Sequence, residues 1–180
     1  MHATLTDVVT DTVQNSIEAG AKNISLSIVE KGGRIAVCIR DDGKGMDEAT
    51  AARAFNPFYT EPGKHDKRRV GLGLPILKQI CESTGGSVSL SSKKGEGTVL
   101  EYSFSAGHID LPPMGDLAAG ILALFNYPGG FELVFSHETD RGSYEISRSA
   151  LADAAGGLDT ADGLSLARDF LSSQEDALRQ

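Results

Sequence analysis

The sequence has no tryptophan and only two cysteines in 180 residues, and acidic residues outnumber basic ones. Cys38 and Cys81 lie in apolar segments, which predicts buried reduced thiols and not a disulfide or a metal pair. A net charge of −8 argues against a nucleic-acid-binding protein, because affinity for phosphates depends on clustered lysines and arginines. No apolar run approaches the roughly 20 residues of a membrane span, and no secretory signal is recognisable. We therefore expect a cytoplasmic globular protein.

The common phosphate-binding and catalytic motifs are also missing. The chain has no G-x-x-x-x-G-K-[ST] run, and Gly71-Leu72-Gly73 lacks the third glycine of the dinucleotide fingerprint. Its four histidines are scattered without metal-ligand spacing, and no serine or cysteine has a partner pattern for nucleophilic catalysis. A nucleotide pocket in this chain must therefore be built from other elements.

Hydrophobic periodicity divides the chain into helices and strands. Helices are predicted at 3–19, 47–54, 74–83 and 116–125, and near 149–155 and 161–178. Alternating segments predict strands at 23–30, 34–40, 87–92, 98–104, 131–137 and 143–147. The character of the sequence changes after Gly107, so we expect an α/β domain at 1–106 and a small α+β C-terminal extension at 107–180.

Asp11 and Asn15 are four residues apart in a predicted helix, so their side chains project from the same face. This face is opposite the apolar stripe of Val9, Val13 and Ile17. A carboxylate there can accept a proton from an attacking water, and an amide oxygen one turn away can bind Mg²⁺. Taken alone, the pair is more often the solvated polar face of an amphipathic helix.

Asp41 ends a predicted strand and leads into a turn that contains Gly43 and Gly45. Glycines can adopt positive φ and allow a ligand to approach the backbone closely. A buried carboxylate at this point can accept a hydrogen bond from an exocyclic amine such as that of adenine. A plain Asp-Gly turn is the alternative interpretation of this segment.

A second glycine pair, Gly71 and Gly73, precedes a predicted helix. Free backbone N–H groups at the positive end of a helix dipole form an anion site. The basic segment 64–69 comes directly before these glycines and could fold over a triphosphate, although a solvated charged loop explains it equally well. Phe55 and Phe58 are expected to anchor the base of this loop in the core.

In their order along residues 4–105, these motifs resemble the ATP-binding domain shared by gyrase, Hsp90, histidine kinases and MutL, known as the Bergerat or GHKL fold. The resemblance implies ATP and Mg²⁺ as cofactors. It makes Asn15 the Mg²⁺ ligand, Asp11 the general base of the hydrolysing branches, and Asp41 the adenine contact. It also places further residues at the nucleotide: Gly43, Gly45, Met46, Phe58, Lys64, Gly71, Leu72, Gly73, Leu74 and Thr98.

The motifs leave the branch of the family open. The segment 56–86 resembles bacterial sensor histidine kinases, whereas 14–21 is closer to MutL, with Glu18 where kinases usually carry a basic residue. Asp11 is one methylene shorter than the glutamate of the hydrolysing enzymes, which argues against efficient water activation. None of the four histidines lies in a phosphoacceptor setting, so we expect no autophosphorylation within this chain.

We therefore expect a two-layer α/β sandwich, with a mixed sheet covered by helices and a mobile lid at 58–72. The expected function is Mg²⁺-dependent ATP binding by a histidine-kinase-like protein, either a signalling kinase that acts on a separate phosphoacceptor protein or a slow ATPase. A MutL-like ATPase switch and a non-catalytic nucleotide sensor are the alternatives. The extension could pack on the sheet, dock a partner protein or form a homodimer.

Overall fold

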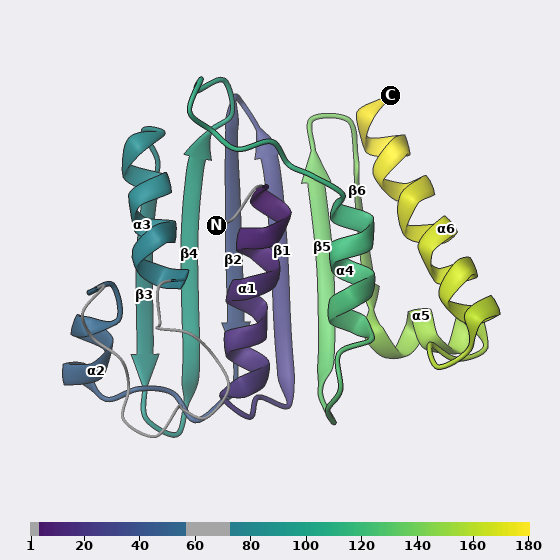
Figure 1. Ribbon diagram of the computed structural model, residues 1–180, viewed down its shortest axis with the longest axis horizontal. Coiled ribbons are helices and arrows are strands. Elements are labelled where there is room, and N and C mark those ends of the chain that lie inside the picture. The colour runs from purple at the N-terminus through teal and green to yellow at the C-terminus, as the bar shows by residue number, and fades with distance from the viewer. Residues whose placement is uncertain (1–3, 57–72) are drawn as a thin grey trace.

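The computed structural model describes residues 4–56 and 73–180, which form a six-stranded sheet with helices packed on one face (Figure 1). The strands are β1 (Asn23–Lys31), β2 (Arg34–Asp41), β3 (Ser87–Lys93), β4 (Gly97–Ser105), β5 (Glu132–Thr139) and β6 (Ser143–Ser147). The helices are α1 (Leu5–Glu18), α2 (Glu48–Arg53), α3 (Gly73–Ser83), α4 (Leu117–Phe125), α5 (Arg148–Ala155) and α6 (Ala161–Arg179). The architecture is the predicted two-layer α/β sandwich.

The sheet is mixed and has the strand order β3-β4-β2-β1-β5-β6. Strands β1 and β2 form a tight hairpin through Gly32 and Gly33, which both have positive φ, as a two-residue turn of this kind requires. All described pairs are antiparallel except β1 with β5, which run parallel from Asn23 opposite Glu132 to Glu30 opposite Thr139. The extension therefore continues the sheet of the first hundred residues along the edge of β1.

Helix α1 lies across the centre of the sheet and is fixed at its start and in its middle. Its N-cap Thr4 and Asp7 form a reciprocal capping box, which satisfies two backbone donors of the first turn. In the middle of the helix, the buried Thr12 Oγ1 lies 3.2 Å from the Tyr102 hydroxyl of β4. Burial raises the pKa of Tyr102, so this hydroxyl stays protonated and available as a hydrogen-bond donor.

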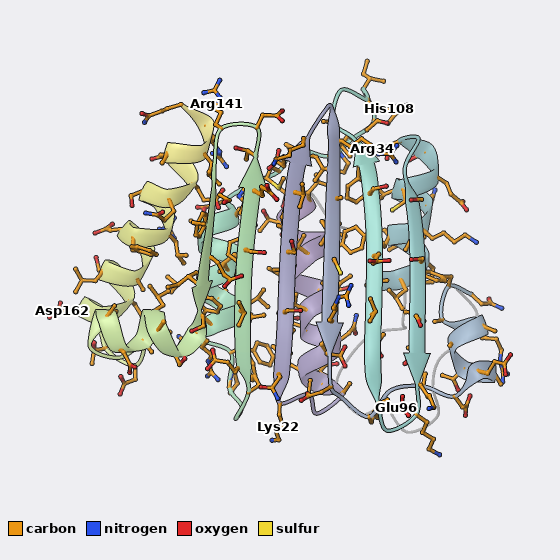
Figure 2. The ribbon with its side chains drawn as sticks, turned by 180° about the vertical axis from the view of Figure 1, so that it is seen from behind. Lys22, Arg34, Glu96, His108, Arg141 and Asp162 are labelled. Atoms are coloured by element: carbon orange, nitrogen blue, oxygen red, sulfur yellow. The ribbon has the colours of Figure 1, made fainter. Side chains whose placement is uncertain are left out.

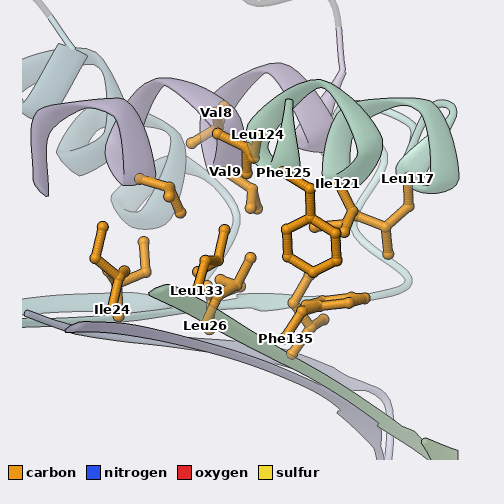
Figure 3. Close-up of a cluster of buried hydrophobic side chains, with 14 of the residues drawn as sticks. Val8, Val9, Ile24, Leu26, Leu117, Ile121, Leu124, Phe125, Leu133 and Phe135 are labelled. Carbon is orange, nitrogen blue, oxygen red and sulfur yellow. The ribbon is translucent and has the colours of Figure 1, made fainter. Parts of the chain in front are cut away.

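One hydrophobic core joins the two halves of the chain (Figure 3). Helix α1 contributes Val8 and Val9, and α4 places Phe125 beside them. Below these helices lie Leu26 of β1 and Phe135 of β5. Because strands and helices from both halves share this core, the extension is packed on the first hundred residues and not tethered beside them.

The opposite face of the sheet is not covered by any helix of the described residues (Figure 2). Cys38 is half-buried on this face, because strand alternation directs it away from its buried neighbours Val37 and Ile39. The prediction of a buried thiol was therefore wrong for Cys38 and right for Cys81, whose burial raises its pKa to about 11. No described helix combines the length and apolar character that a bilayer crossing demands.

Candidate functional site

The predicted adenine contact, Asp41, is held between α1 and the turn that follows β2. Its Oδ2 accepts a hydrogen bond of 2.7 Å from Ser16 Oγ of α1, and its Oδ1 accepts one of 2.9 Å from the backbone N–H of Gly43. The side chain is half-buried. These two donors fix the plane of the carboxylate, while each oxygen keeps a lone pair for a further donor. Asp41 is thus preorganised to accept a hydrogen bond from a ligand.

Glycines allow the turn after Asp41 to pack directly on its neighbours. Gly43 is buried, and a Cβ there would lie 2.9 Å from Asp41 Oδ1 and 3.1 Å from the Ala19 carbonyl oxygen. Gly45 has φ +60°, and a Cβ on it would overlap the Lys93 carbonyl. Gly43 and Gly45 were both predicted to lie at the nucleotide. Each is required because the chain after β2 packs too close to neighbouring atoms to leave room for a side chain.

Ser92 joins this turn to the β3–β4 hairpin. Its Oγ accepts a hydrogen bond of 2.9 Å from the Met46 N–H, donates to the Gly97 carbonyl at 3.0 Å, and lies 2.8 Å from Thr98 Oγ1. Thr98 is also the direct partner of Asp41 in the β2–β4 ladder. Three predicted site residues, Asp41, Met46 and Thr98, are thus brought together where β2 ends and β4 begins.

Asp11 and Asn15 are both half-buried on α1, and Asp11 faces the start of α3. A Cβ at Gly73, the first residue of α3, would overlap Asp11 Oδ2. The Asp11 carboxylate therefore lies directly against the helix start that was predicted to bind phosphate. Asn15 is next to Ser16, the residue that holds Asp41, so α1 carries residues toward both the predicted phosphate end and the predicted adenine end of the site.

The donor set fits the cofactors that the sequence implies. Asp11 and Asn15 present a carboxylate and an amide oxygen one helical turn apart, which are the hard oxygen ligands that Mg²⁺ prefers. Gly73 lies at the positive end of the α3 dipole, and its missing side chain makes room there for the Asp11 carboxylate. These residues are suited to a magnesium-bound polyphosphate.

Several predicted site residues lie outside the described residues. They are Phe58, Lys64, Gly71 and Leu72, together with the expected lid at 58–72. Leu74 is described and packs partly buried against the core. Phe55 also packs partly buried against the core, as predicted for the base of the loop.

The sequence interpretation missed two serines that organise the site, Ser16 and Ser92. Ser16 was visible only as a small polar residue beside Asn15, although its spacing of three residues from Val13 and seven from Val9 places it on the buried face of α1. Ser92 ends up next to Thr98 through the β3–β4 register, which pairs the two residues directly. The predicted hairpin between these strands was the one signal that could have found Ser92.

A neighbouring carboxylate, Asp42, has a structural task. It accepts hydrogen bonds from the backbone N–H groups of Lys22 at 2.6 Å and Asn23 at 2.9 Å, and from the Asn23 side chain. The hydrogen bond from the Asn23 backbone is the main cause that lowers the pKa of Asp42. The charge of Asp42 therefore holds the loop between α1 and β1 and is not directed to the ligand side.

Comparisons with known proteins identify the family of the chain. The family described as histidine kinase-, DNA gyrase B-, and HSP90-like ATPase matches residues 2–108. The sensor histidine kinase YkoH of Bacillus subtilis is 34% identical over 95 residues, covering 52% of this chain and 21% of that protein. The heme sensor protein HssS of Staphylococcus saprophyticus is 34% identical over 104 residues, covering 58% of this chain and 22% of that protein. The match thus spans about a fifth of each relative.

A solved structure extends the likeness beyond the matched family segment. The N-terminal domain of a DNA repair protein aligns with a TM-score of 0.60 and 17% identity, covering 91% of this chain and 59% of that one. At this identity the likeness concerns the fold alone, and it includes most of the extension. With the family match over more than half of its length, the chain belongs to the histidine kinase-, DNA gyrase B- and HSP90-like ATPase family.

Proposed function

We propose that this chain is a Mg²⁺-dependent ATP-binding protein that acts as a signalling kinase on a separate protein. The observation that carries the proposal is the anchored Asp41 carboxylate, held at 2.7 Å by Ser16 and at 2.9 Å by Gly43 within a glycine turn. Such a carboxylate recognises an exocyclic amine, and family membership implies that ATP provides it. The kinase assignment is supported by the sensor kinases among the relatives.

We propose roles for residues of α1 and α3 at the phosphate end of the site. Asn15 would hold the magnesium ion through its amide oxygen, and the α3 start at Gly73 would bind phosphate oxygens through backbone N–H groups. Bound Mg²⁺ would neutralise charge on the phosphates during transfer. Asp11, placed against Gly73, is positioned to accept the proton of an attacking hydroxyl or water.

An ATPase switch is the second candidate, and one structural feature favours it. The start of α1 is bonded directly to the segment that enters the extension, because the Leu5 N–H donates to the Pro113 carbonyl at 2.8 Å and the Thr6 N–H to Met114 at 2.9 Å. A movement of α1 on nucleotide binding would therefore pull on the extension. In that case hydrolysis at Asp11 would reset the conformation.

Incubation with γ-labelled ATP and Mg²⁺ tests both candidates, with bound nucleotide, free phosphate and protein-attached label separated. We expect wild type to retain ATP and Asp41→Asn to lose most of this retention, because the amide presents only one acceptor oxygen. Asp47→Asn is the matched control: Asp47 caps α2 beside the site, and asparagine caps a helix equally well. Unchanged retention in Asp41→Asn would overturn the pocket assignment.

The same experiment distinguishes hydrolysis, phosphoryl transfer and binding alone. Free phosphate that disappears in Asp11→Asn would establish the ATPase switch. Retention of ATP without hydrolysis, followed by label on an added acceptor protein, would establish the kinase. Retention with neither product would favour a nucleotide sensor.

A further inference from the structure

Helix α6 exposes two large apolar side chains on one face. Among the described residues, the large hydrophobic side chains that remain exposed are Ile109, Leu166 and Phe170. Leu166 is 58% exposed and Phe170 40% exposed, and the two are four residues apart on α6. Side chains at this spacing are neighbours on a helix surface. Exposed Ala177, seven residues beyond Phe170, continues the same line.

This line is separate from the face that attaches α6 to the molecule. The attaching face carries the buried Ala167, Leu171 and Leu178. On the same side, Glu175 is bonded to His137 of β5 and to Tyr144 of β6. The packing of α6 on the molecule therefore leaves Leu166 and part of Phe170 exposed to solvent.

A row of carboxylates runs beside the apolar line. Asp162, Asp169 and Asp176 are all exposed. They are seven residues apart, which is about two helical turns, so they lie on one side of the helix. Figure 2 shows Asp162 at the outer end of the molecule, beyond the edge strand β6. The outer face of α6, formed by Leu166, Phe170 and the three aspartates, thus points away from the rest of the chain.

We propose that the outer face of α6 docks a basic amphipathic helix of a protein partner. An apolar ridge at four-residue spacing fits the grooves of a second helix, as in common helix–helix packing. The three aspartates select lysine or arginine beside that ridge, because opposite charges steer the encounter and like charges are rejected. Docking there would add a helix to the layer that α4 and α6 already form.

The same charges argue against other occupants. A second copy of this chain would bring two rows of aspartates together across the interface, which costs free energy. An anionic membrane surface would repel the row for the same reason, since it attracts lysine- and arginine-rich helices. The proposal concerns a surface at the end of the sheet opposite α3 and does not depend on the proposed function.

The experiment uses the whole chain and two designed helical peptides as probes. Both peptides carry leucines at four-residue spacing, and they differ only in a row of seven-spaced lysines or glutamates beside the leucines. Fluorescence anisotropy measures binding of each labelled peptide at low and at high salt. We expect the lysine peptide to bind, with an affinity that falls as salt rises, and the glutamate peptide to bind at least about tenfold more weakly.

Variants locate the site. We expect two variants to weaken binding of the lysine peptide about tenfold or more: the double variant Leu166→Ser, Phe170→Ser and the single variant Asp169→Lys. Their circular dichroism should be unchanged, because these side chains are exposed. Asp110→Lys, a charge reversal in the exposed linker before α4, should have no effect. Equal binding of both peptides, or full affinity in Asp169→Lys, would overturn the proposal. Self-association that the double variant abolishes would assign the face to a second copy instead.

Discussion

At the scale of single residues, the candidate nucleotide site depends on glycines, which have no side chain to prevent close packing. Gly45 and Gly95 both adopt positive φ in neighbouring turns, but they differ in their surroundings. A Cβ at Gly45 would overlap the Lys93 carbonyl, whereas a Cβ at Gly95 would meet nothing within 4 Å. Comparing alanine substitutions at the two glycines therefore separates the free-energy cost of backbone strain from that of steric overlap with Lys93.

We predict that Gly45→Ala lowers the free energy of unfolding by about 2–4 kcal/mol, because left-handed strain and steric overlap add. Gly95→Ala should cost only about 1–2 kcal/mol, from strain alone. Urea denaturation measures both, and ATP retention should fall only in Gly45→Ala, since its turn carries Asp41. Equal losses of stability in the two variants would show that the Lys93 contact is unimportant.

A buried histidine provides the pH dependence of the fold. His137 is 2% exposed, and its two ring nitrogens each lie 3.0 Å from a carboxylate oxygen, of Glu175 and of Glu30. Burial alone would lower the pKa of His137, but these hydrogen bonds and charges raise it to about 9. Burial likewise would raise the pKa of Glu175, and the bonds from His137 and Tyr144 lower it instead.

Because the folded-state pKa of His137 lies above its ordinary value of 6.5, its contribution to stability is complete below that pH and disappears as pH rises toward about 9. The contribution is on the order of 3 kcal/mol. We predict that the free energy of unfolding falls across this window in wild type and stays flatter in His137→Gln, as measured by urea denaturation at several pH values. His108→Gln, in the linker, is the control, and an unchanged slope in His137→Gln would contradict the assignment.

The residue scale also shows what sequence could and could not foresee. Asp41, Gly43 and Gly45 were predictable because an acidic residue and glycines at a strand end have a local chemical meaning. Ser16 and Ser92 were not identified, because their roles depend on the partners Asp41 and Met46, which are distant from them in sequence. The placement of Asp11 against Gly73 likewise depends on how α1 and α3 pack.

At the scale of elements, helix α4 crosses α1 at a glycine. A Cβ at Gly120 would overlap Thr6 Cγ2, so the α4 backbone approaches α1 as closely as the Thr6 side chain permits. The helices themselves were predictable from periodicity: the segment expected at 116–125 begins at Leu117, with Asp116 as its cap. Their close contact was not, because periodicity identifies a buried face without naming the partner.

We predict that Gly120→Ala lowers the free energy of unfolding by about 1–2 kcal/mol, although alanine is the better helix former. In a Thr6→Ser background that methyl group is gone and the 3.2 Å approach to Thr10 Cγ2 remains, so the same substitution should cost less or become neutral. Serine keeps the hydroxyl group, so it can still donate the hydrogen bond that Thr6 Oγ1 makes to the Met114 carbonyl. A double-mutant cycle by urea denaturation measures the coupling, and additive effects would refute a direct Gly120–Thr6 contact.

At the scale of the whole molecule, the two parts of the chain share a sheet. The sequence indicated a change of character after Gly107 and left open whether the extension packs on the sheet; the structure places β5 along β1. Pairing between strands so far apart leaves no mark on local periodicity, so the strand order could not be foreseen. The division at 1–106 and 107–180 stays a prediction about autonomy, which truncation can test.

We predict that a chain ending at residue 106 is less stable than the whole chain and associates. Removing β5 leaves the backbone groups of β1 unpaired from Asn23 to Glu30, and removing α4 uncovers the apolar side of α1. An exposed strand edge is a template for pairing with other chains. Sedimentation and urea denaturation measure both effects.

Ser27→Lys in the truncated chain separates the two causes of association. Ser27 lies on the uncovered sheet face of β1, and a lysine on an edge strand discourages edge-to-edge pairing without replacing lost core contacts. We expect this variant to associate less while remaining as unstable as its parent, because stability depends on the shared core of α1, α4, β1 and β5. A truncated chain that is monomeric and unfolds at the same urea concentration as the whole chain would show that 1–106 is an autonomous domain.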